Sequence, residues 1–421
     1  MRDEGLTPAL SMTTDLLTVK LEKLTYGGDA FGRLSDGRAV FIPFGLPGET
    51  VRARIVDEKR DHVRAELVEL VEPSLKRIEP RCKHFGICGG CHYQHLSYPE
   101  QQIVKTGILR DQLTRLGKIE NPPVLPIISS PCEWNYRNHI QFHLTPAGKL
   151  GYVDVHSRNI VPITECHLPE NQLNDLWPML DFEPGLGLEQ VSLRLGLDGE
   201  IMLVLESDLS EIPAMELEAD LSVVHIAAGD TVILAGDEHL VISVNERPFY
   251  VSAGSFFQVN IEIAGKMVEY LLAHLPASPE TTLLDVYCGV GLFSAFLAPR
   301  VGRLIGIESS SSACKDFTIN LDEFGNVELY EAPAEEVLPT LDVDPDIVIV
   351  DPPRAGLEKR ALEALLALAP TLFAYVSCDP STLARDASRL IAGGYRLVEV
   401  TPFDLFPQTY HIESLSLFEK G

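Results

Sequence analysis

The sequence contains no run of 18 or more apolar residues, so it predicts no membrane-spanning helix. Its first fifteen residues, MRDEGLTPALSMTTD, also lack the apolar stretch of a secretory signal peptide. Positive charge is scarce, because 34 Lys and Arg residues stand against 61 Asp and Glu residues and give a net charge of −27. This balance counts against an extended basic surface for nucleic acid, but binding depends on local fields. We expect a cytoplasmic protein. Its length of 421 residues is enough for two or three domains.

Cysteines are few, eight in all, but three of them gather within ten residues. Cys82, Cys88 and Cys91 have the spacing C-x5-C-G-G-C, which in a cytoplasmic chain suggests a metal site before disulfides. Zinc sites usually offer two C-x2-C pairs, and this segment has one. The spacing excludes a radical enzyme of the C-x3-C-x2-C type. Zinc and an iron–sulfur cluster both fit the spacing, and either needs a distant fourth ligand.

The pattern of apolar residues changes along the chain. Residues 13–72 are short apolar segments separated by TYGGDAFG, LSDG and GLPG, which is typical of a small all-β barrel. Residues 134–250 are mostly strand-like, and from residue 261 strands alternate with helices, which predicts a doubly wound, mostly parallel sheet. A helix is expected over residues 98–118, with five apolar side chains near helical spacing: Ile103, Ile108, Leu109, Leu113 and Leu116.

Four ionisable residues directly end or follow strands of this predicted α/β sheet. They are Asp285, Glu308, Asp351 and Cys378. Ligands of such sheets bind outside the carboxyl ends of the strands. The agreement of four positions therefore predicts a ligand site at that edge.

Two glycines and an acid indicate how a nucleoside would bind there. In LLDVYCGVGLFS, Gly289 and Gly291 lie between a strand and a helix, where glycine permits a tight turn and a close approach to a ligand. Glu308 ends the next strand and can accept hydrogen bonds from both ribose hydroxyls. With Asp285 it resembles the S-adenosylmethionine site of class I methyltransferases. Alternatively, the glycines only shape a turn and Glu308 is an exposed acid beside a helix.

Asp351 and Cys378 indicate the chemistry. Asp351 precedes two prolines, a motif typical of amino-group methyltransferases, but Arg354 replaces the aromatic residue of that motif. A thiolate that adds to carbon 6 of uracil makes carbon 5 nucleophilic toward a methyl donor, and a base then removes the carbon 5 proton. Cys378 is the candidate nucleophile and Glu413 the candidate base. The alternatives are a buried small hydrophobe for Cys378, a helix-capping acid for Asp351 and a salt-bridge acid for Glu413.

Five segments carry a resemblance to a known family, and the resemblance covers the chain from about residue 13 to 420: CKHFGICGGCHYQH, SFFQVN, DPPRAGL, SCDPSTLARD and FPQTYHIES. Together they resemble the RNA uracil-5 methyltransferases, and more narrowly the bacterial 23S rRNA branch with a TRAM domain and a [4Fe-4S] cluster. The resemblance implies that Cys378 is the nucleophile and Glu413 the base. It implies a cluster held by Cys82, Cys88, Cys91 and Cys166. It also implies an S-adenosylmethionine site formed by Gln258, Tyr287, Glu308 and Asp351.

The same resemblance implies three domains and an RNA partner. They are an RNA-binding TRAM barrel over residues 13–72, a central cluster domain over 73–250 and a class I methyltransferase domain over 251–421. The protein is expected to be a monomer that acts on 23S rRNA, and Phe256 or Phe257 is expected to stack on a uracil flipped out of its strand.

Two alternatives and one residue remain open. The chain could methylate tRNA, or it could be a non-catalytic RNA-binding iron–sulfur protein, although such a binder would not need Cys378, Glu413 and Asp351. Asp379 follows the candidate nucleophile, where Asn is frequent in the family. If it points inward, it raises the pKa of the thiol; the alternative is that it caps the next helix.

Overall fold

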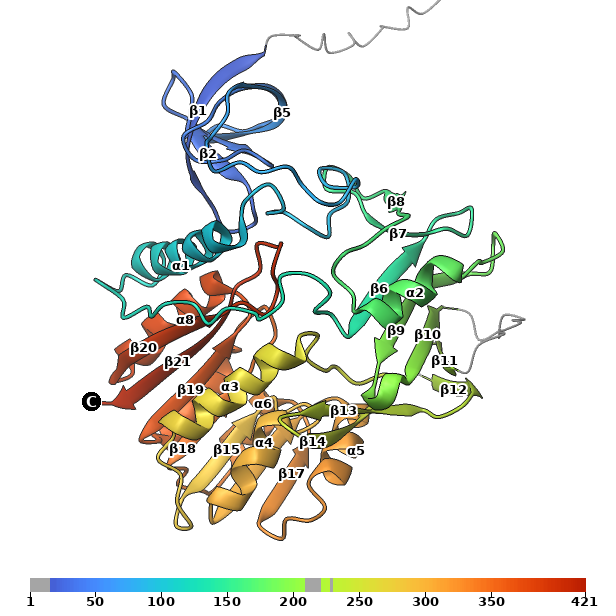
Figure 1. Ribbon diagram of the computed structural model, residues 1–421. Coiled ribbons are helices and arrows are strands. Elements are labelled where there is room, and N and C mark those ends of the chain that lie inside the picture. Colours follow the sequence, from blue (N-terminus) through green and yellow to red (C-terminus); the bar gives the residue numbers. More distant parts are fainter. Residues whose placement is uncertain (1–15, 209–220, 228–229) are drawn as a thin grey trace, which may run out of the picture. The chain divides into compact units, whose positions relative to one another are not determined.

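The computed structural model describes residues 16–208, 221–227 and 230–421 (Figure 1). The segment tested for a signal peptide, 1–15, lies outside the described residues, and so do the first three residues of the predicted barrel. The chain divides into two compact units, one formed by the residues up to 79 with His95–Ser97, the other by Pro80–Gln94 with Tyr98–Gly421. The second unit contains both the central and the methyltransferase regions that the sequence separated at residue 250. Among the described helices, none has the length and apolar character needed to cross a membrane.

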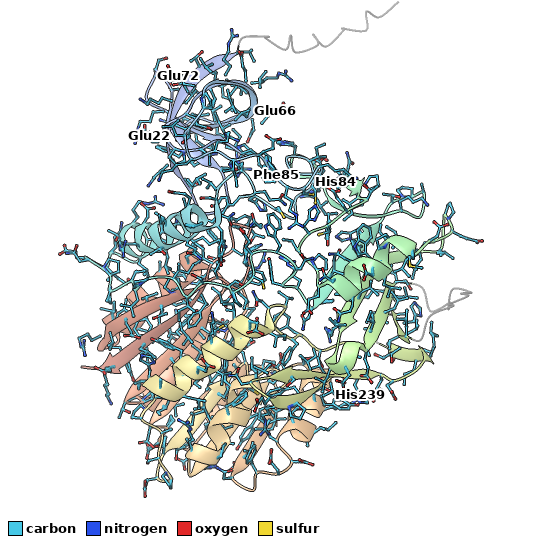
Figure 2. The ribbon with its side chains drawn as sticks, viewed as in Figure 1. Glu22, Glu66, Glu72, His84, Phe85 and His239 are labelled. Carbon is cyan, nitrogen blue, oxygen red and sulfur yellow. The ribbon has the colours of Figure 1, made fainter. Side chains whose placement is uncertain are left out.

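The first unit is a closed barrel with the strand order β1-β2-β3-β5-β4, which confirms the expected β-barrel. Alternate side chains point into the barrel, where Val19, Leu21 and Val40 are buried. Figure 2 shows Glu22 and Glu72 among the side chains on its outside. Its strands are β1 (Leu17–Leu24), β2 (Ala30–Arg33), β3 (Ala39–Ile42), β4 (Thr50–Glu58) and β5 (His62–Glu72).

A buried ion pair joins the barrel to the segment that follows it. The Glu49 side chain has no exposed surface, and Arg77 donates to both of its carboxylate oxygens at 2.7 Å. Burial opposes the charge of Glu49, but the hydrogen bonds from Arg77 and from two backbone N–H groups keep its pKa below the ordinary value.

The second unit begins with irregular chain and one long helix, α1 (Tyr98–Arg115). This confirms the predicted helix, but the expected apolar face is only partly right. Ile103 and Leu116 are exposed, whereas the polar residues Gln101 and Lys105 are buried. The buried face of α1 is therefore partly hydrophilic.

The central sheet has seven strands in the order β12-β11-β10-β9-β6-β7-β8. Its pairs are antiparallel except for β10 with β11, which run parallel. A separate hydrophobic core on this sheet includes Phe142 and Trp177. Trp177 directly follows the short helix α2 (Asn171–Leu176). The strands are β6 (His139–Leu144), β7 (Leu150–Val153), β8 (Ile160–Pro162), β9 (Leu188–Leu195), β10 (Ile201–Ser207), β11 (Ser222–Ala227) and β12 (Asp230–Ala235).

The second seven-stranded sheet has the order β17-β16-β15-β18-β19-β21-β20, and only β21 runs antiparallel to its neighbours. The chain leaves β15 toward β16 on one side and returns to β18 on the other, so the topological switch point lies between β15 and β18. The expected α/β sheet is thus confirmed. Its strands are β15 (Thr282–Val286), β16 (Arg303–Glu308), β17 (Val327–Glu331), β18 (Ile347–Val350), β19 (Leu372–Ser377), β20 (Tyr395–Phe403) and β21 (Glu413–Lys420).

Helices cover this sheet, and α3 and α4 pack against each other on one face (Figure 1). The hairpin of β13 (His239–Val244) and β14 (Arg247–Ser252) contributes Val244 and Phe249 to the same hydrophobic core, although the sequence assigned it to the central region. The helices are α3 (Ile261–His274), α4 (Leu292–Leu297), α5 (Ser311–Asn320), α6 (Ala334–Val337), α7 (Lys359–Leu368) and α8 (Pro380–Ala392).

Candidate active site

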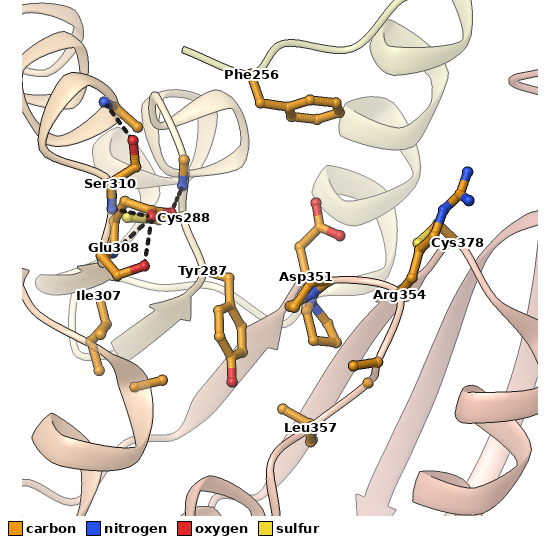
Figure 3. Close-up of a pocket in the computed structure, with 18 of the residues that line it drawn as sticks. Phe256, Tyr287, Cys288, Ile307, Glu308, Ser310, Asp351, Arg354, Leu357 and Cys378 are labelled. Atoms are coloured by element: carbon orange, nitrogen blue, oxygen red, sulfur yellow. Dashed lines mark hydrogen bonds between the residues drawn. The ribbon is translucent and has the colours of Figure 1, made fainter. Parts of the chain in front are cut away.

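A cavity of about 1080 Å³ opens at the carboxyl ends of β15, β16, β18 and β19 (Figure 3). This is the switch-point edge at which the sequence predicted a ligand site. The structure brings eight of the predicted residues to its lining: Phe256, Phe257, Gln258, Tyr287, Glu308, Asp351, Cys378 and Glu413.

The turn after β15 has a backbone that most residues avoid. Tyr287 has φ +65° and Gly291 has φ +88°, both in the left-handed region. A Cβ atom at Gly291 would lie 2.5 Å from Leu321 and 2.9 Å from Phe317, so only glycine fits there. The turn brings the N–H of Gly289 to a Glu308 carboxylate oxygen at 3.0 Å.

Glu308 is fixed by the backbone on both of its oxygens. One oxygen accepts from Gly289, and the other accepts from the N–H groups of Ser309 and Ser310, both at 2.7 Å. Figure 3 shows these bonds on the far side of the cavity from Cys378. A carboxylate held this way still has lone pairs free to accept from a ribose diol.

Two further acids interact electrostatically with Glu308. Asp285 is fully buried, accepts from Ser294 Oγ at 2.6 Å and has its pKa raised to about 6 by burial. Burial, with the charges of Asp285 and Glu308, raises the pKa of Asp351 to about 7. The cavity therefore disfavours further negative charge near Asp351.

Cys378, directly after β19, and Glu413, the first residue of β21, both face this acidic environment. Ser377 at the end of β19 pairs with Ser414 in β21, so Cys378 and Glu413 lie opposite each other one position further along. Burial, then the charges of Glu413 and Asp351, raises the pKa of Cys378 to about 12. Burial also raises the pKa of Glu413 well above its ordinary value, and Asp351 adds to this effect.

Asp379 does not oppose the thiolate in the way that the sequence suggested. It is the N-cap of α8, and its Oδ1 accepts from the N–H groups of Ser381 at 2.8 Å and Thr382 at 3.1 Å. Its charge raises the pKa of Cys378 less than those of Glu413 and Asp351 do. The open question about Asp379 is thus answered in favour of the cap.

The cation beside the thiol is Arg354. Arg385 pairs with Asp386 at 2.8 Å. Arg354 lines the cavity and lowers the pKa values of both Cys378 and Glu413 (Figure 3). Sequence reasoning noted Arg354 only as a departure from another family, although a cation inside the Asp351 motif was a usable signal.

The two phenylalanines have different environments. Phe257 is buried, with its ring centroid 5.8 Å from that of Phe249 in the hydrophobic core. Phe256 is 72% exposed and stands over the cavity in Figure 3. Of the two, Phe256 is the one whose ring is free to meet a base. Gln258 is buried at the same lining.

His411, also at the cavity, stays uncharged near neutral pH. Burial, with the nearby charge of Arg354, lowers its pKa to about 3. Its ring contacts those of Phe406 and Tyr410, with centroids 5.5 Å and 4.3 Å away. His411 therefore packs as a neutral ring.

A second, smaller cavity of about 50 Å³ lies elsewhere in this unit. Among the described residues, no group of three or more His, Cys, Asp or Glu side chains is arranged to hold a single metal ion. Burial raises the pKa values of the four cysteine thiols that line this cavity. The pKa of Cys166 is raised to about 11. The cavity is lined by the four cysteines predicted to hold a cluster: Cys82, Cys88, Cys91 and Cys166.

Close contacts with neighbouring atoms explain the two glycines between Cys88 and Cys91. Gly89 donates to Val153 O at 2.9 Å, and a Cβ atom there would lie 2.8 Å from the same oxygen. The N–H of Gly90 donates to Cys88 Sγ at 3.4 Å, a bond that favours a thiolate. The hydrogen bond from Gly89 thus holds the cysteine segment at the end of β7, and its sulfurs face one cavity.

Comparisons with known proteins agree with this geometry. A family model described as tRNA (Uracil-5-)-methyltransferase matches residues 206–421, and one described as the TRAM domain matches residues 11–68. An uncharacterized RNA methyltransferase of Gloeobacter violaceus is 34% identical and aligns over 98% of both chains. One of Halalkalibacterium halodurans is also 34% identical, over 96% of this chain and 97% of its own. The chain belongs to the RNA uracil-5 methyltransferase family.

A solved structure extends the likeness to the whole fold. The Pyrococcus abyssi tRNA (uracil-54, C5)-methyltransferase, in complex with S-adenosyl-L-homocysteine, superposes with a TM-score of 0.73 and is 26% identical. The match covers 96% of this chain and 100% of that one. The chain is an S-adenosylmethionine-dependent RNA uracil-5 methyltransferase with an N-terminal TRAM barrel, as the sequence motifs implied.

The charges around Cys378 can be tested with two variants that should change its pKa in opposite directions. Arg354→Gln removes a cation, so it should raise the pKa of Cys378 and slow its alkylation by iodoacetamide at least about threefold at about pH 9. Asp351→Asn removes a negative charge, so it should lower that pKa and speed the same reaction. Mass spectrometry of the Cys378 peptide measures both rates, with the exposed Cys132 as internal control. Changes of the same sign in both variants would contradict the electrostatic account.

Proposed function

We propose that Cys378 is the nucleophile and Glu413 the base in methylation of carbon 5 of a uridine in RNA. The observation that carries the proposal is the register of β19 and β21, which sets these two side chains opposite each other in one cavity. Attack at carbon 6 and proton removal at carbon 5 act on adjacent ring atoms. A nucleophile just past the end of one strand and a base at the start of the neighbouring strand suit that spacing.

The steps balance with these two residues. The Cys378 thiolate bonds to carbon 6, and the electrons of the carbon 5–carbon 6 double bond attack the methyl group as its bond to the donor sulfur breaks. Glu413 takes the carbon 5 proton, the double bond reforms, and the carbon 6–sulfur bond breaks to restore the thiolate. One methyl group has replaced one proton.

The residues present suit S-adenosylmethionine. Glu308, held by three backbone N–H groups, is the proposed acceptor of the ribose hydroxyls. Gln258, Tyr287 and Asp351 line the same cavity and complete the proposed donor site. When bound, this group supplies the methyl and a positive sulfonium charge. The exposed ring of Phe256 is the proposed stacking partner for the target base.

The proposed substrate is 23S rRNA, on the basis of the five segments and the combination of a barrel with four clustered cysteines. A tRNA substrate is the second candidate, because the similar Pyrococcus protein is a tRNA (uracil-54, C5)-methyltransferase. The barrel is the proposed RNA-binding module.

We also propose that Cys82, Cys88, Cys91 and Cys166 hold a [4Fe-4S] cluster. Four thiols lining one small cavity are a donor set for iron–sulfur chemistry. With all four positions filled by protein, the cluster has a folding or RNA-positioning role.

Trapping the covalent intermediate tests the proposed reaction. With S-adenosylmethionine and RNA that contains 5-fluorouracil, loss of the carbon 5 substituent is blocked, so a covalent protein–RNA complex should accumulate. It should vanish in Cys378→Ala, whereas Glu413→Gln should trap a complex with ordinary RNA. Denaturing gel electrophoresis of labelled RNA measures both. The absence of any complex from the wild-type protein would contradict the mechanism.

Metal analysis tests the proposed cluster. Protein purified without oxygen should contain about four iron and four sulfide per chain. Cys166→Ser should lose most of both, while Cys132→Ser, at an exposed cysteine outside the cavity, should keep them. Zinc without sulfide in the wild-type protein would instead identify a different metal site.

Nucleoside mapping distinguishes the two RNA substrates. We expect a strain that lacks the protein to lose 5-methyluridine from 23S rRNA and to keep it in tRNA. Mass spectrometry of nuclease fragments from both RNAs makes the measurement, and re-expression of the gene is the control. Loss of the modified nucleoside from tRNA alone would establish the second candidate.

A further inference from the structure

The loop between β20 and β21, residues 404–412, delivers Glu413 to the cavity and has no exposed residue. Buried irregular chain is unusual, because each backbone N–H and C=O group needs a partner. The carboxylate of Glu413 accepts no hydrogen bond from any residue in the described part of the chain. Its position therefore depends on the main chain, that is, on the pairing of Glu413, at the start of β21, with Phe403 and on the loop that leads to it.

Helix α1 supplies a buried cation to the loop. Lys105 Nζ lies 2.7 Å from Asp404 Oδ1 and 2.8 Å from Phe406 O. The side chains of Lys105 and Asp404 have no exposed surface. Apolar residues often replace a buried ion pair without loss of stability, so fold stability alone does not explain this one. The pair instead fixes two loop residues at defined points.

A second α1 residue holds the middle of the loop. Gln101 Oε1 accepts from Gln408 N at 2.9 Å, and Gln101 Nε2 donates to Gln408 Oε1 at 2.9 Å. Gln408 has φ +68°, a left-handed conformation that a non-glycine residue keeps only where its surroundings hold it. Gln101 and Lys105 are one helical turn apart, so one face of α1 makes both contacts.

Hydrogen bonds continue from Lys105 toward the base. Phe406 O, which accepts from Lys105, also accepts from Thr409 Oγ1 at 2.9 Å. Thr409 Oγ1 in turn accepts from the N–H of His411 at 3.2 Å. His411 lies two residues before Glu413 and lines the same cavity. Lys105 is thus linked by three hydrogen bonds to the main chain beside Glu413.

We propose that Lys105, supported by Gln101, is a positioning residue for Glu413. The inference rests on the proposed role of Glu413 as the base. Cys378 directly follows β19 and is not part of this loop, so loss of the Lys105 contacts should leave thiol addition and methyl transfer nearly intact. Removal of the carbon 5 proton should slow, since it needs Glu413 in place. The methylated covalent intermediate should therefore accumulate.

The experiment uses the full-length double variant Lys105→Met/Asp404→Asn. Changing both partners avoids leaving one buried charge unpaired, which would itself destabilise the protein. We expect the folded variant to form the 5-fluorouracil complex within about twofold of the wild-type rate, but to turn over at least about tenfold more slowly. A methylated complex with ordinary RNA should accumulate, and release of tritium from carbon 5 should slow equally.

A matched control is the double variant Arg115→Met/Asp111→Asn, which removes an exposed ion pair of the same helix. It should behave as the wild type in every assay. Equal slowing of complex formation and tritium release in the Lys105 variant would show a purely structural role and overturn the proposal, as would unchanged turnover. Failure of the wild-type protein to form any complex would instead remove the proposed function.

A second variant keeps the test decisive if the first does not fold. Gln101→Leu removes both contacts with Gln408 without changing a charge. It should show the same selective loss of tritium release, with a smaller factor. Normal release from folded Gln101→Leu, together with an unfolded Lys105 variant, would count against positioning by α1.

Discussion

The burial of acidic groups at one edge of the seven-stranded sheet is the constraint on which the site depends. Asp351, Cys378 and Glu413 share a cavity in which burial raises the pKa of each, and each negative charge opposes the next. Arg354 only partly offsets this. A sulfonium methyl donor adds positive charge to this cavity. Donor binding and thiol ionisation would then favour each other, because such linkage is reciprocal.

The same edge explains why much of the site could be predicted. An apolar run ends where a strand ends, so residues such as Glu308, Asp351 and Cys378 were placed at the sheet edge from the sequence alone. The direction of neighbouring side chains was not predictable in this way. Asp379 turns to cap α8, and of two adjacent phenylalanines one enters the core and the other faces the cavity. Packing around the loops decides these directions.

Contacts between residues far apart in the sequence were the other part of the structure that could not be predicted. Local patterns predicted the barrel strands, the helix over residues 98–118 and the alternating α/β elements. They did not predict the parallel pair of β10 and β11, or the hairpin of β13 and β14 that joins the methyltransferase core. Nor did they predict Lys105, because a lysine within a helix pattern is expected to face solvent. Its burial requires Asp404, which lies 299 residues away in sequence.

Two irregular segments of the second unit, the cysteine segment and the loop of residues 404–412, also form hydrogen bonds with each other. Gln408 O accepts from the N–H groups of His92 and Tyr93, which directly follow Cys91, and Gln101 Nε2 donates to Tyr93 O. The cysteine segment and the loop that ends at Glu413 therefore share hydrogen-bonding partners. If four thiolates hold a cluster, these hydrogen bonds connect the cluster segment to the loop of the proposed base. A cluster with no open iron can then matter to methylation without taking part in the chemistry.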